Sequence, residues 1–150
     1  MSRCSRILGV LGGLAALYAL YLGVNAPLEK TEGIIQKTMY IHVPSAWAGY
    51  VCFFVTLVAS IVYLANRKRG ADRVALASAE VGVFFFTLVL ITGPLWARPI
   101  WNVWWSWDAR LTSTLVMWFI FVGYLVTRSM APSPTQGARY GAVLAILGNF

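Results

Sequence analysis

Four apolar stretches, each close to the length of a membrane-crossing helix, are the feature that most constrains the fold of this chain. A helix rises about 1.5 Å per residue, so about 20 apolar residues cross the roughly 30 Å hydrocarbon core of a bilayer. The stretches are residues 7–24, 44–65, 74–95 and 111–127. A fifth, 138–150, is too short to cross, and we expect it to be a further span that is cut short where the sequence stops.

Composition supports the same class of protein. Of the 150 residues, 59% are hydrophobic and 11% are charged, whereas soluble domains carry about 25% charged residues. The basic start and apolar run of residues 1–24 resemble a signal peptide, but the run continues without a small-residue cleavage site, so we interpret it as a retained first span. The sequence therefore predicts an all-α, polytopic transmembrane helix bundle in contact with membrane lipid, with residues 1–150 forming a single membrane domain.

Several function classes are disfavoured. The net charge of +7 comes from basic residues in short loops, where they set membrane topology, so we expect no nucleic acid partner. Cys4 and Cys52 are far apart, which favours neither a disulfide nor a metal site. The chain contains no C-x-x-C-H for covalent haem attachment and no P-loop for ATP hydrolysis.

Positive charges predict the orientation of the spans. Basic residues predominate before the first span, between the second and third, and after the fourth: Arg3, Arg6, Arg67, Lys68, Arg69, Arg73, Arg128 and Arg139. The other two loops have nearly balanced charge. By the positive-inside rule, the N-terminus is cytoplasmic and the loop 96–110 is external, on the same side as the residues that precede Pro44.

The external loop 96–110 is rich in tryptophan: Trp96, Trp101, Trp104, Trp105 and Trp107. Indoles favour the membrane interface, and an aromatic belt accounts for one or two of them. Five within twelve residues also suit a platform for a large planar ligand, because aromatic faces stack and bury much apolar area. The residues alone leave both interpretations open.

His42 is the sole histidine, and it directly precedes the span that begins at Pro44. A lone histidine commonly has a structural hydrogen-bonding role. At the external membrane edge, on the same side as the tryptophans, a neutral imidazole is also a candidate axial ligand for haem iron. The topology allows His42 and the tryptophan loop to meet.

Charged residues offer further candidates. Asp108 either caps the fourth span or pairs with Arg110. Arg110, together with Arg98 and Lys37, could meet the carboxylates of a bound porphyrin. Glu80 is the only acid within a span, which makes it a functional candidate unless it snorkels toward Arg69 or Arg73.

Longer stretches resemble a known family. The segment "GPLWARPIWNVWWSWDARLTS" resembles the tryptophan-rich WWD signature of membrane proteins that handle haem in cytochrome c biogenesis. With "EGIIQKTMYIHVPSAWAGY" and "ASAEVGVFFFTLVLITGPLW", the chain resembles one branch closely, the haem exporter protein C (CcmC) family of the cytochrome c maturation system. The resemblance runs from about Glu32 to Ser113.

That resemblance implies a six-span protein of the bacterial inner membrane that holds haem non-covalently at its periplasmic face. His42 matches the first of two histidine ligands, and the WWD motif takes in Trp101, Trp104, Trp105, Trp107 and Asp108. The second histidine is expected in an external loop after span five, beyond the residues of this sequence. The implied partners are a periplasmic haem chaperone, ABC transporter subunits and a small single-span membrane protein.

We therefore expect a haem-binding protein that positions haem and delivers it to the chaperone, rather than an enzyme acting through its own side chains. The alternative is a cytochrome c haem lyase of the same superfamily, which attaches haem to the apocytochrome directly; those relatives are typically longer. A channel or transporter would need polar residues in several spans, and Glu80 is the only acid within one.

Overall fold

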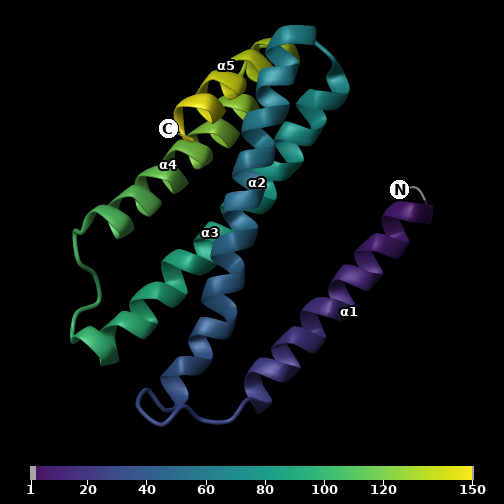
Figure 1. Cartoon of the computed structure of the whole chain (residues 1–150). Helices are drawn as coiled ribbons and strands as arrows, with labels where there is room; N and C mark the ends of the chain where they lie inside the picture. The colour runs from purple at the N-terminus through teal and green to yellow at the C-terminus, as the bar shows by residue number, and fades with distance from the viewer. Residues whose placement is uncertain (1–2, 150) are drawn as a thin grey trace.

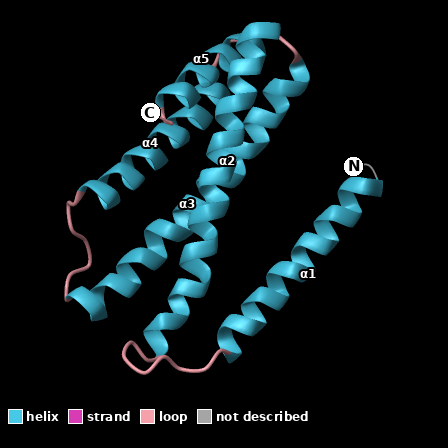
Figure 2. Cartoon of the chain, viewed as in Figure 1, coloured by secondary structure: helices cyan, strands magenta, loops and turns pink. Residues whose placement is uncertain are grey.

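The computed structural model describes residues 3–149, and within them it contains helices and no strand (Figure 2). The helices are α1 (Arg3–Asn25), the short 3-10 helix η1 (Ile34–Thr38), α2 (Met39–Asn66), α3 (Arg69–Trp101), α4 (Ala109–Met130) and α5 (Pro134–Leu147). Within this described range, four segments are long and apolar enough to cross a membrane: α1, η1 with α2, α3, and α4. The predicted all-α bundle is confirmed, and the chain is a multi-pass membrane protein.

Helices α2 and α3 form an antiparallel pair at the centre of the molecule, with α4 and α5 beside one half of it (Figure 1). The pair is close because two glycines face two phenylalanines. A Cβ built on Gly49 would lie 2.3 Å from the Phe86 ring, and one on Gly82 would lie 2.5 Å from the Phe53 ring. Small residues of this kind let helix backbones approach in a membrane, where lipid is as apolar as the side chains.

An aromatic cluster joins α4 to this pair. The ring of Phe53 stacks on Phe121 with centroids 3.7 Å apart and also contacts Phe86 at 4.8 Å. Ala79, Tyr124 and Ala145 complete the buried cluster, so α5 packs against the same core. The core thus lies in the half of α2 and α3 that is nearer to their connecting turn (Figure 1).

Polar contacts between helices supplement the apolar core. Arg128 of α4 donates two hydrogen bonds to Asp72 of α3, at 2.5 and 3.1 Å. This is the only ion pair within residues 3–149, so Glu80 forms none with Arg69 or Arg73. Glu80 is exposed at the edge of a separate cavity of about 690 Å³ between α3 and the α4–α5 connection.

Helix α1 stands apart from the bundle (Figure 1). None of its described residues is buried, and its end is held by Lys37, whose ammonium group donates to the carbonyl of Val24. Lys37 is therefore engaged at the end of α1.

Two helices extend further than the apolar stretches indicated. Helix α2 begins at Met39, so Pro44 lies inside it and His42 belongs to its first turns. Helix α3 continues through Pro94 and Pro99 to Trp101, so the predicted loop 96–110 is helical over its first six residues. Only residues 102–108 connect α3 to α4.

We expect Gly82→Ala to lower the free energy of unfolding by roughly 1–3 kcal/mol, because the added methyl overpacks the contact with Phe53. Gly123→Ala on α4 is the matched control, since a Cβ there meets no atom within 4 Å. Thermal unfolding in detergent, followed by size-exclusion chromatography, measures both. Equal melting temperatures for the two variants would contradict the packing described here.

Candidate functional site

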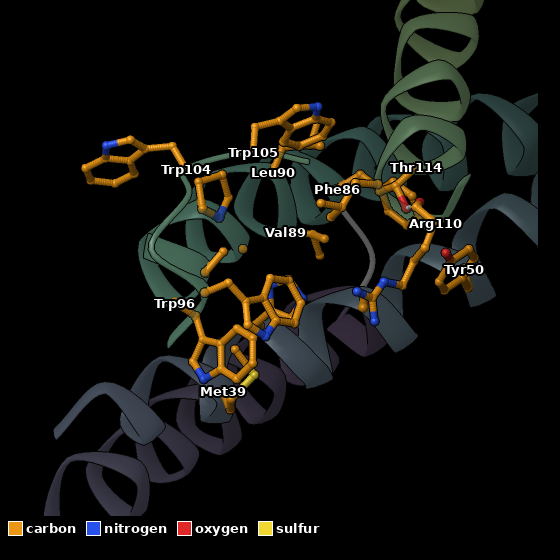
Figure 3. A pocket seen from close by; sticks show the side chains of 17 residues that line it. Met39, Tyr50, Phe86, Val89, Leu90, Trp96, Trp104, Trp105, Arg110 and Thr114 are labelled. Carbon is orange, nitrogen blue, oxygen red and sulfur yellow. Dashed lines mark hydrogen bonds between the residues drawn. The ribbon is translucent and has the colours of Figure 1, made fainter. Parts of the chain in front are cut away.

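A cavity of about 370 Å³ opens between α2, α3 and the start of α4, at the end of the helix pair away from the connecting turn. Its wall is mostly apolar and aromatic. Six of the residues predicted from sequence line it: His42, Trp96, Trp101, Trp104, Trp105 and Arg110. Figure 3 shows Trp96 and Met39 at one edge, Trp104 and Trp105 at the opposite edge, and Arg110 reaching in from α4.

Helical spacing brings the wall together. On α2, His42, Ala46 and Tyr50 follow one another at intervals of four residues and so share one face. On α3, the lining residues recur at three- and four-residue intervals from Phe86 to Trp101. Because the two helices are antiparallel, the start of α2 lies beside the end of α3, and His42 meets residues about 50 positions later in the chain.

His42 is half-buried and lies against α3. Its Nδ1 is 2.9 Å from Oγ1 of Thr92. A Cβ on the neighbouring Gly93 would lie 3.3 Å from Cε1 of the imidazole, so the glycine gives the ring space at the helix surface. The contact fixes the imidazole in the cavity wall.

A chain of contacts connects three segments across one side of the cavity. The indole N–H of Trp96 donates to Glu32, in the turn before η1, at 3.1 Å. Trp96 packs edge-to-face on Trp101 at 4.9 Å, and the guanidinium of Arg110 lies 5.5 Å from the centroid of the Trp101 ring. Aromatic pairs and cation–π contacts of this geometry are favourable, so the three side chains support one another.

The remaining tryptophans occupy the connection between α3 and α4. Trp105 packs edge-to-face on Trp107 at 5.9 Å. Trp107 is 78% exposed and lies outside the cavity wall, as an interfacial anchor would. The indole nitrogen of Trp105 is buried and has no hydrogen-bond partner among residues 3–149. A buried donor without a partner is uncommon, and it leaves a group at the cavity that a ligand oxygen could satisfy.

Two other predicted residues have local structural contacts. Arg98 donates to the backbone and side-chain oxygens of Asn102, which ends α3 in a left-handed conformation with φ of 58°. Asp108 accepts from the backbone N–H of Leu111 at 2.9 Å, which confirms the capping interpretation, and from the Ser106 hydroxyl at 2.7 Å. These hydrogen bonds, that of Leu111 first, hold the pKa of Asp108 below its ordinary value. Neither residue lines the cavity.

Sequence reasoning missed two polar residues that hold the site. From the sequence, Glu32 was interpreted only as an acid that balances the basic residues of its loop, and no role was predicted for Thr92. Thr92 does precede Trp96 by four residues, so both lie on one face of α3. This four-residue spacing was the feature of the sequence that could have indicated a role for Thr92 at the site.

Comparison with known proteins gives a consistent result. A sequence model of the family described as "Heme exporter protein C" matches residues 1–150. A Heme exporter protein C from Bradyrhizobium diazoefficiens is 40% identical over 129 residues, covering 86% of this chain and 49% of the relative. The Paracoccus denitrificans Heme exporter protein C is 32% identical over 142 residues, covering 93% and 59%.

A plant protein is also similar. A ccmC-like mitochondrial protein of cytochrome c biosynthesis from Arabidopsis thaliana is 34% identical over 114 residues, covering 75% of this chain and 44% of that protein. The chain thus spans about half the length of the relatives it matches.

The Asp108 cap predicts a pH dependence at the start of α4. Because the pKa of Asp108 is lowered in the folded protein, its contribution to stability is present above the ordinary carboxyl pKa and is lost as pH falls through the lowered value. We expect amide-exchange protection of Leu111 to decrease in that acidic range in the wild type. In Asp108→Ala, the protection should be reduced already at pH 7.

Asp108→Asn is the matched control, because an asparagine oxygen caps a helix about as well as a carboxylate and does not titrate in this range. We expect it to retain protection at pH 7 and to lose the acidic transition. Protection at Leu111 that is identical in all three proteins at both pH values would exclude the capping role.

Proposed function

The chain belongs to the Heme exporter protein C family, and we propose that its cavity binds haem non-covalently and presents it for cytochrome c biogenesis. The observation that carries this proposal is a largely apolar, tryptophan-lined cavity whose wall contains the sole histidine of the chain. Haem is a flat apolar ring with iron at its centre and two carboxylates at one edge. It needs a stacking surface, an axial nitrogen and a cation, and this cavity offers all three.

His42 would supply the axial ligand. Its Nδ1 is occupied by Thr92, and Nε2 makes no hydrogen bond to any of residues 3–149. Neutral imidazole nitrogen is a common ligand of haem iron. With haem in the cavity, Nε2 of His42 would be the nitrogen available to the iron, and the tryptophans of the wall would exclude water from the porphyrin: Trp96, Trp101, Trp104 and Trp105.

Arg110 would meet the propionates. Among residues 3–149 it is the only lysine or arginine that lines the cavity, and guanidinium binds carboxylate through parallel hydrogen bonds. Arg98 would contribute from the rim only after releasing Asn102. Asp108 would act indirectly by fixing the start of the helix that carries Arg110, and Trp107 would anchor the connection in the membrane interface.

The proposed orientation places the site at the periplasmic face of the bacterial inner membrane. The cavity lies at the end of α2 and α3 opposite their basic turn, and the positive-inside rule assigns that turn to the cytoplasm. From there haem would pass to a periplasmic haem chaperone. ABC transporter subunits and a small single-span protein would complete the assembly.

Two substitutions test the haem site. The protein is purified in detergent and titrated with haem. His42→Ala should shift the Soret band and weaken haem binding by about 10-fold or more, because loss of a residue that only hydrogen-bonds to a metal ligand already lowers metal affinity by about 10-fold. Trp104→Ala should lower haem occupancy with a smaller spectral shift. Trp47→Ala is the control, because Trp47 is 70% exposed on α2 and does not line the cavity. Unchanged occupancy and spectra in both site variants would refute the site.

The role of Arg110 has a separate test that uses a modified ligand. Arg110→Ala should weaken haem binding by about 10-fold, the loss expected for one charge-assisted contact, whereas Arg98→Ala should have little effect. With haem dimethyl ester, which lacks free carboxylates, wild type and Arg110→Ala should bind equally. If Arg110→Ala weakens the ester as much as haem, Arg110 does not act on the propionates.

A further inference from the structure

The hydroxyl of Thr92 contacts two groups at once. These two contacts together determine which group donates in each hydrogen bond. Its Oγ1 lies 2.7 Å from the carbonyl oxygen of Leu88 and 2.9 Å from Nδ1 of His42. A carbonyl oxygen only accepts, and a threonine hydroxyl has a single hydrogen. Because that hydrogen is donated to Leu88, the imidazole nitrogen must be the donor in the second contact.

This direction determines the tautomer of His42. A neutral imidazole carries one hydrogen, so a protonated Nδ1 leaves Nε2 with a free lone pair. In water the opposite tautomer, with hydrogen on Nε2, is the favoured one. Thr92 therefore selects the tautomer that His42 would not otherwise prefer, and Nε2 stays unpaired among residues 3–149.

Gly93 provides an independent constraint on the same ring. The position that its Cβ would take lies 3.3 Å from Cε1 and 3.9 Å from Nδ1 of His42. The imidazole thus lies directly on the surface of α3, with one edge hydrogen-bonded by Thr92. A side chain of fixed tautomer and fixed position is what a metal-ligating histidine requires.

We propose that Thr92 is the positioning residue of His42: it accepts the Nδ1 hydrogen and thereby leaves Nε2 as the nitrogen that binds haem iron. The tautomer follows from the protein alone. The assignment to iron rests on the proposed function. Thr92 itself touches no ligand in this scheme, and it does not line the cavity.

Helix α3 contains a matched control for this role. Thr87 also donates to the carbonyl four residues earlier, that of Val83, at 2.8 Å. It likewise accepts a hydrogen bond across the helix interface, from the indole of Trp118 at 2.9 Å. Thr87→Val removes the same group from the same helix without touching His42, so it separates a general loss of helix packing from the specific effect.

The first experiment reads the tautomer without haem. Because the chain has one histidine, labelling with ¹⁵N-histidine gives NMR signals from His42 alone at a pH where the imidazole is neutral. We expect a protonated Nδ1 in the wild type and in Thr92→Ser, which keeps the hydroxyl, and in Thr87→Val. In Thr92→Val, the hydrogen should move to Nε2.

The second experiment reads the iron bond. In the reduced, haem-loaded protein, Thr92→Val should lower the iron–histidine stretching frequency in resonance Raman spectra and weaken haem binding by about 10- to 100-fold. Thr92→Ser should retain the wild-type frequency and affinity, and Thr87→Val should leave the iron–histidine frequency unchanged.

The two experiments test separate parts of the inference, and each part can be overturned without the other. A hydrogen on Nε2 in the wild type, or an unchanged tautomer in Thr92→Val, overturns the role of Thr92. An unchanged Soret band in His42→Ala contradicts the proposed function and the iron half of this inference, whereas the haem-free tautomer still decides the role of Thr92. An iron–histidine frequency that is insensitive to Thr92→Val, in a protein that needs His42 for haem, overturns the assignment of Nε2.

Discussion

The reciprocal contacts between α2 and α3 are the constraint on which the rest of the structure depends. Gly49 accommodates Phe86, and Gly82 accommodates Phe53, so the two backbones approach closely near the middle of both helices. The same approach brings His42 within hydrogen-bonding distance of Thr92 at the end of the pair away from the connecting turn. In lipid, apolar surface alone does not drive helices together, so this steric fit and the cross-helix hydrogen bonds have to define the geometry.

Helix α4 shows how those polar contacts position the site. Near the C-terminal end of α4, Arg128 binds Asp72, and near the middle of the helix Trp118 donates to Thr87. Both partners belong to α3, so α4 is held at two points along its length against the helix that contributes the most residues to the cavity wall. Its first turn, capped by Asp108, then carries Arg110 to the cavity. The position of one guanidinium thus depends on contacts that extend along the whole helix.

The helices could be predicted because, in a bilayer, every backbone polar group must be satisfied within the segment, and length and composition then determine the fold class. The helix ends could not be predicted, because α2 and α3 continue beyond the apolar stretches where contacts with other segments support them. One such contact is the hydrogen bond from Trp96 to Glu32. His42 and the tryptophans were found because such residues are rare. Thr92 could not be predicted in the same way. The hydroxyls of Thr56, Thr87 and Thr92 all donate to the carbonyl four residues earlier, and the sequence does not reveal which of them also contact a neighbouring helix.

The tryptophans of the external segment differ in their surroundings. Trp107 is exposed, as a membrane-interface anchor would be, while Trp96 and Trp101 contact Glu32 and Arg110 within the wall of the cavity. Two nitrogen atoms at the cavity have no hydrogen-bond partner among residues 3–149: Nε2 of His42 and the buried indole nitrogen of Trp105. Folding alone favours satisfying such groups. The buried hydroxyls of Ser60 and Thr112 also lack partners among residues 3–149, but they do not line the cavity. The two cavity nitrogens differ because they belong to side chains of one aromatic wall, so they are the groups that a ligand in this cavity would contact.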